Sequence, residues 1–460
     1  MHKTFSTALT LALAGTALAA APSAGHPAAP PTSGDGCEVR VMAWPGGVDD
    51  GTVMDIEVVP GLGTVYYGSY LVDDPDRGMA RRAVVWYGLD AQPVRVGPAG
   101  TAYDIALELT PSGKINGQSV VDETGRERAW VQDLRTGKVT WVDTPEDASG
   151  IYVRRINDRG EAAGTVFGEE NAKDAVVWWP RVDRPGRVLP APGKFGYAMG
   201  WGINNFRDVV GFFDHYVEQY DAIVTYGVTW DRHGSPTLLA SNPGNDGDSF
   251  PRVINNAGQA AGGAWYGDFF EGHFEAARWP SPDVIEPLGL LPGGGYSEVY
   301  GQSEGGWTVG LADHFDPDSP GALPWGAVDH SVLWTDDLGA ARVLPSPYAV
   351  EQGQDDWRDW FGGAAHGVNT GLDQVGTSSH DAWRDDGTIR FAPTVYVNAS
   401  QCGELVPTSH TAFWEEPADE GMALSSLSSE VSTSRVAQGL PAQPRAYHRD
   451  AVRERIAELP

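Results

Sequence analysis

Cysteine and positive charge are both scarce in this sequence. The 460 residues include only two cysteines and no Cys-x-x-Cys motif. Lys and Arg number 32 against 62 Asp and Glu, which gives a formal net charge of −30. Nucleic acids and anionic membrane surfaces bind proteins through a basic footprint, so we expect neither as a partner. The acidity suits solubility in a salty extracellular medium, and a cation-binding face is the alternative interpretation.

Familiar catalytic motifs are also missing. The sequence contains no Gly-x-Ser-x-Gly elbow, no His-Glu-x-x-His motif and no phosphate-binding glycine loop. A carboxylate pair for glycosidic cleavage could be chosen in many ways from 62 acidic residues, so the sequence selects none. No reaction is therefore indicated, and a binding role is favoured over an enzymatic one.

Glycine and tryptophan are abundant, and they recur with a period of about 48 residues. The 58 glycines, 33 prolines and 17 tryptophans suit many short strands joined by turns. One part of the repeat is an Ile-Asn-x-x-Gly phrase followed four residues later by a second glycine. The second glycines are Gly68, Gly117, Gly164, Gly211, Gly262, Gly310 and Gly376. The other part is a short apolar segment that ends at Trp86, Trp130, Trp178, Trp230, Trp279, Trp334 or Trp414.

Each repeat predicts four short antiparallel strands. The Asn-x-x-Gly phrase is typical of a tight turn in which the amide caps the turn and glycine takes a positive φ. The second glycine lies within a strand, where a missing side chain lets a neighbouring backbone or a tryptophan approach. Seven such units predict an all-β fold, a seven-bladed β-propeller with four-stranded antiparallel blades. A linear β-solenoid is the alternative, but nothing limits a solenoid to seven units.

The two ends of the repeat array are predicted to meet. Residues 38–45 resemble a fourth strand that precedes the first repeat, so we expect this N-terminal strand to close the last blade beside the Trp414 strand. Cys37 and Cys402 lie at these two ends and predict one disulfide in an oxidising compartment. Two free, buried thiols are the alternative.

The segments outside the repeats predict export. Residues 1–19 combine a short basic start, an apolar stretch and a small-x-small cleavage pattern, which is typical of a signal peptide. Residues 20–36 predict a flexible mature N-terminus, residues 37–415 the propeller, and residues 416–460 a Ser- and Pro-rich tail, largely disordered with a possible short helix. We expect a secreted monomer without membrane insertion.

Candidate ligand-binding residues follow the second glycines of the fourth, sixth and seventh repeats. Three pairs occur there: Asp214–His215, Asp313–His314 and His380–Asp381. Histidine and carboxylate together can bind a metal or act as acid and base, so a shared rim site is one interpretation and solvated surface residues the other. Short acidic stretches could hold Ca²⁺, and the candidates are Asp246, Asp248, Asp316 and Asp318.

The repeats also resemble the extracellular HAF repeats, in which a His-Ala-Phe strand alternates with a Gly-Ile-Asn-x-x-Gly segment. The matching stretches here are 410–414, 330–334 and 202–204 with 209–211. The resemblance covers roughly residues 50–415 and implies a secreted propeller, without a catalytic residue set to carry over.

The leading functional hypothesis is a secreted propeller that binds a ligand or partner, such as a glycan or a protein, through its loop-bearing face. The alternative is a metal-assisted propeller hydrolase or lyase acting on carbohydrate or a small secreted metabolite. A purely structural role at the cell surface is the third.

Overall fold

The structure is a computed structural model. It describes residues 36–45, 48–74, 78–101, 103–121, 127–146, 148–168, 174–190, 197–217, 222–242, 248–267, 272–319, 322, 326–335, 339–354, 356–360, 362–383 and 389–412. The expected signal peptide, most of the flexible N-terminus, the tail from residue 416, Trp414 and Asp246 lie outside these residues. Among the described residues, no helix is long and apolar enough to cross a membrane.

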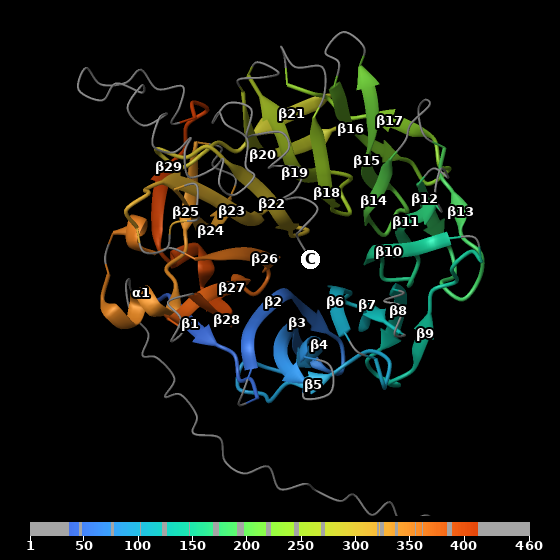
Figure 1. The fold of residues 1–460 in the computed structure, drawn as a ribbon, viewed down its shortest axis with the longest axis horizontal. Helices are drawn as coiled ribbons and strands as arrows, with labels where there is room; N and C mark the ends of the chain where they lie inside the picture. Colours follow the sequence, from blue (N-terminus) through green and yellow to red (C-terminus); the bar gives the residue numbers. More distant parts are fainter. Residues whose placement is uncertain are drawn as a thin grey trace, which may run out of the picture.

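Seven antiparallel sheets form a closed ring, which confirms the predicted seven-bladed β-propeller (Figure 1). We use the word channel for the axis of this ring. Within a blade we name the strands a to d from the channel outward. The innermost strands, a, are β2, β6, β10, β14, β18, β22 and β26. The turns a–b and c–d lie at one end of the ring, and the b–c and d–a connections lie at the other, which we call the loop-bearing face.

The strand bounds follow the repeat. Blades 1 to 3 contain β2 (Val48–Val59), β3 (Gly63–Asp74), β4 (Gly78–Trp86), β5 (Val94–Arg95); β6 (Tyr103–Leu109), β7 (Lys114–Val120), β8 (Glu127–Asp133), β9 (Val139–Trp141); β10 (Ala148–Ile156), β11 (Ala162–Gly168), β12 (Ala175–Trp179) and β13 (Arg187–Val188). Blades 4 and 5 contain β14 (Ala198–Ile203), β15 (Val209–Val217), β16 (Ala222–Trp230), β17 (Pro236–Leu238); β18 (Ser249–Ile254), β19 (Ala260–Tyr266), β20 (His273–Ser281) and β21 (Val284–Pro287). Blades 6 and 7 contain β22 (Ser297–Gln302), β23 (Thr308–Phe315), β24 (Ala327–Trp334), β25 (Ala340–Val343), β29 (Glu404–Pro407); β26 (Gly363–Asn369), β27 (Gln374–Trp383), β28 (Ile389–Val397) and β1 (Glu38–Val41). Short helices are α1 (Pro347–Gln352), η1 (Trp357–Asp359) and η2 (Ala399–Gln401).

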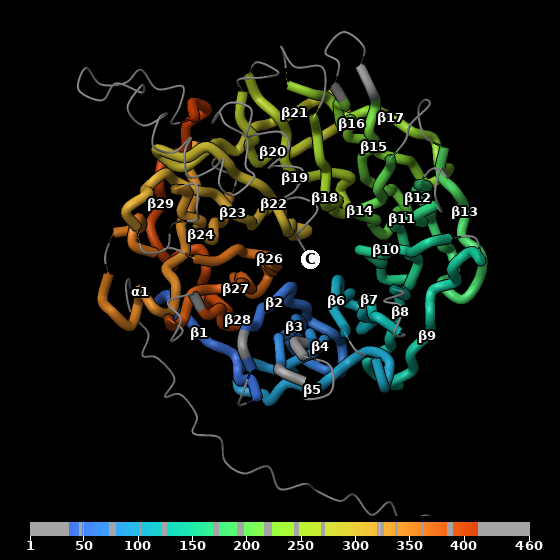
Figure 2. Tube along the Cα trace, in the orientation of Figure 1, coloured from blue at the N-terminus to red at the C-terminus, as the bar shows by residue number. Residues whose placement is uncertain are grey.

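The N-terminal strand closes the ring, as predicted, but its partner differs. β1 pairs antiparallel with β28, so strand c of blade 7 is Ile389–Val397 and not the segment that ends at Trp414. Figure 2 shows the blue start of the described chain beside the orange strands of blade 7. The chain after β28 instead returns to blade 6, where β29 adds a fifth strand next to β25. The prediction is wrong because strand c of blade 7 carries Tyr396 in place of the repeat tryptophan, so the HAF-like segment at 410–414 matches the repeat better than the true strand does.

The disulfide joins the two ends of the described ring. Cys37 precedes β1 and Cys402 follows η2, and their sulfur atoms are bonded at 2.12 Å. The bond closes a loop with a sequence separation of 365 residues. Both side chains are buried beside β1 and β28, so the bond reinforces the same closure that the strand pairing makes.

The repeat asparagine joins blades 3, 4 and 7 to the blade that follows each of them. Asn204 Oδ1 accepts hydrogen bonds from the backbone N–H groups of Phe206 and Asp208, each at 2.9 Å, which caps the a–b turn as predicted. Its Nδ2 donates to the backbone carbonyl of Asn255 in blade 5 at 3.1 Å. Asn157 in turn donates to the carbonyl of Asn204 at 3.1 Å. One side chain therefore shapes its own turn and fixes the position of its neighbour.

The second glycine faces a β-bulge in strand a. A Cβ built on Gly164 would lie 2.1 Å from the carbonyl oxygen of Tyr152. The register of β10 against β11 shifts next to this glycine, between Val153 and Arg155. The same shift recurs in strand a of every blade. In blade 7 the glycine position is taken by Thr377, one residue beyond the expected Gly376.

The aromatic anchors of strand c pack between blades. Trp230 donates from Nε1 to the Pro190 carbonyl in the preceding blade at 2.7 Å, and Trp86, Trp179 and Trp279 make equivalent bonds. In blade 3 the anchor is Trp179 and not Trp178. In blade 7 Tyr396 takes the place that we assigned to Trp414, and its hydroxyl donates to the Pro345 carbonyl at 2.8 Å. Each hydrophobic cluster around these anchors draws residues from two neighbouring blades, so the core forms layers between sheets.

Candidate functional site

The three predicted histidine–aspartate pairs lie on strands and not in loops. They occupy strand b of their blades, on β15, β23 and β27, toward the loop-bearing face: Asp214, His215, Asp313, His314, His380 and Asp381. Strand b is longer than the repeat suggested, because each of these strands continues past its glycine toward the loop.

In blade 6 the side chains of Asp313 and His314 are both buried, and each contacts groups close to it in the fold. His314 Nδ1 lies 2.8 Å from His330 Nε2, and His330 Nδ1 lies 3.1 Å from the Trp360 carbonyl oxygen. Burial, with the nearby His314, lowers the pKa of His330 to about 3, so this imidazole is neutral near pH 7. Asp313 Oδ1 accepts hydrogen bonds from the backbone N–H groups of Gly295 and Tyr296.

In blade 7 His380 is buried against aromatic rings. Its ring lies 4.4 Å from that of Tyr348 and 5.0 Å from that of Trp383. Burial lowers the pKa of His380 to about 4. Asp381 forms a two-pronged ion pair with Arg390 at 2.9 and 2.7 Å.

In blade 4 Asp214 accepts a hydrogen bond from the Thr225 hydroxyl at 2.6 Å. The exposed His215 lies 6.3 Å from the ring of Tyr226. The contacts described for the three pairs stay within one blade and its adjoining loop, so none of these contacts brings two pairs together. A shared ligand site for the pairs stays a prediction.

The predicted calcium ligands have other partners where the structure describes them. Asp248 is buried, and its Oδ1 accepts a hydrogen bond from the Thr225 backbone N–H at 2.8 Å. Asp316 Oδ1 accepts a bond from the backbone N–H of Asp318 at 3.1 Å. Within the described part of the chain, no three His, Cys, Asp or Glu side chains are grouped so that they could hold a metal ion. A calcium site at these residues therefore gains no support here.

Residues at the bulges of the inner strands form a second candidate site that the sequence analysis did not identify. Each bulge inserts one residue that has no register partner on strand b, and strand a is the innermost strand of its blade (Figure 1). We call these seven residues the bulge ring: Met54, Leu107, Arg154, Trp201, Arg252, Tyr300 and His366. Bulges re-aim side chains, and here they direct one residue per blade to the same depth of the ring.

Five residues of the bulge ring stack on one another from blade 3 to blade 7. The guanidinium carbons of Arg154 and Arg252 lie 4.7 and 4.5 Å from the Trp201 ring. Arg252 also lies 4.9 Å from the Tyr300 ring, and Tyr300 stacks on His366 with centroids 5.5 Å apart. We call this series the arc. Alternating guanidinium and aromatic groups attract one another through the ring quadrupole.

The arc is packed against an acid and an aromatic cluster. Arg252 is 1% exposed, and its Nε forms an ion pair with Glu298, which is 0% exposed. The Glu298 carboxylate also accepts a hydrogen bond from the Tyr296 hydroxyl at 2.5 Å. Phe250 lies two residues before Arg252 and packs edge-on with neighbouring aromatic rings of blades 4 and 5. This packing holds the arc rigidly from the loop-bearing side.

The electrostatic surroundings of the bulge ring differ between its two sides. Burial, together with the positive charges of Arg154, Arg252 and Arg81, lowers the pKa of His366 to about 3. His366 is therefore a neutral imidazole beside three guanidinium groups. These guanidinium groups lie in a chain of net charge −30.

Carboxylates gather on the opposite side, one residue beyond the bulge in blades 1 and 2. Burial raises the pKa of Asp55 well above its usual range, and Glu108 raises it further. Burial also raises the pKa of Glu108, although the adjacent Arg155 opposes this shift through an ion pair. Burial and the neighbouring acids raise the pKa of Glu57 to about 9. This side of the channel binds protons readily at neutral pH.

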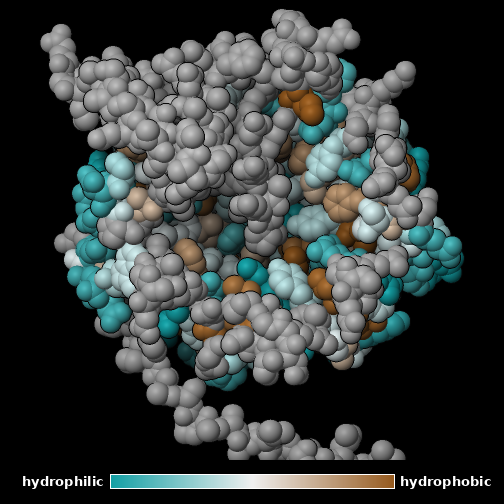
Figure 3. Space-filling model, viewed as in Figure 1, coloured by the Kyte–Doolittle hydropathy of each residue, from teal (hydrophilic) through white to brown (hydrophobic). Residues whose placement is uncertain are grey.

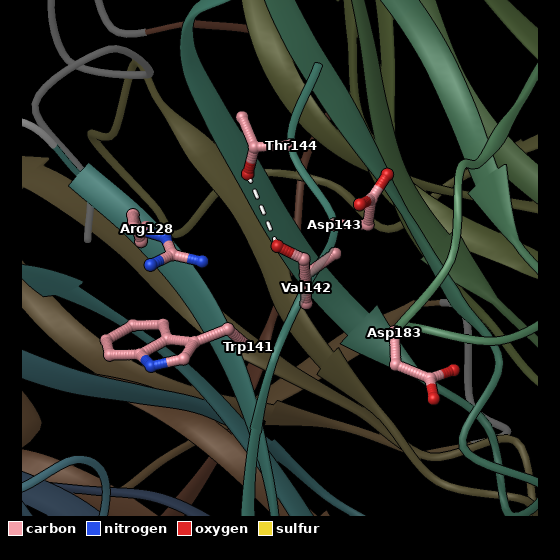
Figure 4. A pocket seen from close by; sticks show the side chains of 6 residues that line it. All are labelled: Arg128, Trp141, Val142, Asp143, Thr144 and Asp183. Atoms are coloured by element: carbon pink, nitrogen blue, oxygen red, sulfur yellow. Dashed lines mark hydrogen bonds between the residues drawn. The ribbon is translucent and has the colours of Figure 1, made fainter. Parts of the chain in front are cut away.

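A pocket of about 300 Å³ lies on the outer part of the ring between blades 2 and 3 (Figure 4). Arg128 stacks on Trp141 at 4.5 Å on one side of it, and Asp183 lies on the other side. Arg181 pairs with Asp183 at 2.9 Å and lowers the pKa of that carboxyl group. On the face shown in Figure 3, hydrophobic residues of the described chain form separate areas between hydrophilic ones.

Known proteins show only a distant likeness to this chain. No family model matches the sequence, and no curated protein matches it. Among solved structures, the β-propeller domain of the trilobed protease from Pyrococcus furiosus is 11% identical, with a TM-score of 0.46, covering 82% of this chain and 99% of that one. TolB from Acinetobacter baumannii is 12% identical, with a TM-score of 0.37, covering 64% of this chain and 61% of its own. The acylaminoacyl peptidase of Pyrococcus horikoshii is 11% identical, with a TM-score of 0.39, covering 64% and 46%. The chain spans less than two thirds of the length of the last two proteins, and the likeness extends to the propeller fold alone.

Proposed function

We propose that this protein is an exported β-propeller that binds a ligand inside its central channel, entered from the loop-bearing face. One observation carries the proposal. Five of the seven bulge-ring residues are charged or aromatic, whereas the matched positions of blades 1 and 2 hold Met54 and Leu107. A ring that needed only apolar filling would not place two arginines and a histidine there, since burying such groups costs free energy.

Export is supported by the sequence of residues 1–19 and by the disulfide. A disulfide between Cys37 and Cys402 is stable in an oxidising compartment and is rarely kept in the cytosol. The resemblance to extracellular HAF repeats agrees with the same location. Expression of the full chain in a secreting bacterium tests this part of the proposal. Mass spectrometry of the culture medium should find a mature protein that begins near residue 20 and carries no free thiol.

Hydrogen–deuterium exchange tests the location of binding. The purified protein would be incubated with small molecules extracted from the culture medium of the organism that produces it. Backbone amide exchange would then be compared with and without these molecules. We expect added protection at the inner strands, above all β14, β18 and β22, with little change in the outer strands β9, β13 and β17. Protection confined to the outer strands or to the c–d turns would contradict a channel site.

A further inference from the structure

We propose that the arc of Arg154, Trp201, Arg252, Tyr300 and His366 binds the oxyanion group of a small ligand, a carboxylate or a phosphate. This inference deepens the proposed function, because it assumes that the channel is the binding site. It concerns the chemical class of the ligand, which follows from three features of the arc.

The first feature is a pair of buried hydrogen-bond donors without acceptors. Within the described residues, Arg252 Nη2 and Trp201 Nε1 have no hydrogen-bond partner, although the two side chains are 1% and 3% exposed. Leaving a buried donor unpaired costs about 1–3 kcal/mol, and more for a charged group. Both donors belong to adjacent members of one stack. A ligand oxygen that accepted from both would recover this cost.

The second feature is that the aromatic faces are already covered. Trp201 has Arg154 from blade 3 and Arg252 from blade 5 over its ring, and Tyr300 has Arg252 and His366. Sugars and aromatic ligands stack on free aromatic faces. The arc instead presents ring edges and guanidinium N–H groups. These groups suit an acceptor that bears negative charge, which a guanidinium binds through two parallel hydrogen bonds.

The third feature is the local balance of charge. Glu298 neutralises Arg252, but Arg154 and Arg81 also act on the same imidazole, and that imidazole is neutral. Three guanidinium groups therefore act on one neutral imidazole within a strongly acidic protein. The surrounding acidity would repel anions from the outer surface, so specific binding of an anion needs such a buried positive group.

Isothermal titration calorimetry of the full chain would measure the binding of succinate, inorganic phosphate and glucose. We expect succinate or phosphate to bind and glucose not to bind. Succinate without phosphate would indicate a carboxylate ligand, and the reverse a phosphate ligand. Binding of glucose alone, or of none of the three, would overturn the proposal.

Two variants locate that binding. Trp201→Phe removes the indole N–H and keeps an aromatic ring, and Arg154→Gln removes one guanidinium. Each should weaken the oxyanion by about tenfold, the size of one charge-assisted hydrogen bond. Arg128→Gln is the matched control, because Arg128 stacks on Trp141 in the same way at the outer rim and should leave binding unchanged.

Circular dichroism would first confirm that each variant is folded. Arg252→Gln would be added where it folds, and the other two variants suffice where it does not. Wild-type affinity in both Trp201→Phe and Arg154→Gln would overturn the assignment of the arc. Such a result would leave the proposed function standing if exchange protection still fell on the inner strands, whereas protection on the outer strands would refute the proposed function itself.

Discussion

In six of the seven blades, a glycine without a Cβ faces the bulge of the inner strand. Gly164 lies so close to the Tyr152 carbonyl that any side chain would collide with it. The bulge in β10 and the projection of Arg154 into the bulge ring depend on that close approach. The glycine therefore supports both the blade and the candidate site.

We predict that Gly164→Ala destabilises the protein by about 1–3 kcal/mol or more, because a Cβ would meet a backbone atom that cannot move aside alone. Urea denaturation measures the loss. Gly150→Ala is the matched control in the same blade, since the nearest atom to its Cβ would be the Phe167 side chain at an ordinary 3.4 Å. Equal losses in the two variants would show that close packing at Gly164 is unimportant.

The acid cluster beside the channel predicts a pH dependence. Burial, with the charges of Asp55, Glu108, Asp158 and Glu304, raises the pKa of Glu57 from 4.5 to about 9. The folded protein thus keeps a proton that the unfolded chain releases above pH 4.5. This contribution to stability is complete below pH 4.5 and is lost as the pH rises toward 9.

Glu57→Gln should remove that dependence, because glutamine stays neutral. Relative to wild type, the variant should gain at least about 1 kcal/mol in unfolding free energy between about pH 5 and about pH 9. The measurement is urea denaturation at both pH values. Glu146→Gln, at an exposed position, should show no such gain, and a gain of equal size there would contradict the assignment to Glu57.

At the scale of the strand, the aromatic residue of strand c connects one blade to the previous one. Trp230 packs in the layer between blades 3 and 4 and hydrogen-bonds the carbonyl of Pro190. Tyr396 makes the corresponding bond to Pro345 with a hydroxyl group. Tryptophan holds this register position in five blades and tyrosine in blade 7, whereas blade 2 has Gln132 there.

Two tryptophan substitutions separate the hydrogen bond from the packing. Trp230→Phe and Trp334→Phe remove the same indole atoms from fully buried sites. Trp334 Nε1 has no hydrogen-bond partner among the described residues, whereas Trp230 Nε1 has one at 2.7 Å. We expect Trp230→Phe to cost about 1 kcal/mol more in unfolding free energy. Thermal or urea unfolding would measure both, and equal costs would assign the whole effect to packing.

At the scale of the molecule, two devices close the ring at the same place. β1 completes blade 7, and the Cys37–Cys402 disulfide holds the chain that flanks it. A propeller whose last blade lacks its outer strand leaves a strand edge and an apolar layer exposed. The chain-entropy formula assigns the disulfide about 5–6 kcal/mol as an upper limit.

Removing the disulfide alone should have a smaller effect than removing both the disulfide and β1. Cys37→Ser with Cys402→Ser should lower the melting temperature and keep one cooperative transition, because the β1–β28 ladder remains. A chain that begins at residue 46 loses both and should lose cooperative thermal unfolding in calorimetry. An unchanged melt of the shortened chain would show that closure by β1 does not stabilise the ring.

The fold was largely predictable because its signals are local. The Asn-x-x-Gly turn, the second glycine and the tryptophan strand each need only a few neighbouring residues to act, so seven copies of them predict seven blades. The predictions were wrong where a copy departs from the repeat. Blade 3 has two adjacent tryptophans, and in blade 7 Tyr396 and Thr377 replace the last tryptophan and the last glycine, so the HAF-like segment at 410–414 fits the repeat better than the true strand does.

The candidate site could not be predicted in the same way. Which residue faces the channel depends on a bulge, and a bulge is a property of two paired strands and not of either one alone. In the sequence, nothing distinguishes Arg154 or Arg252 from the other residues of its strand. Only the folded ring brings both guanidinium groups over the indole of Trp201. The sequence by itself determined the repeat and the number of blades, through short-range turn and packing chemistry, whereas the structure decided between the Cys37–Cys402 disulfide and two free thiols. Only the tertiary structure decided which side chains meet in the channel, because those contacts join residues that the chain keeps about 50 positions apart.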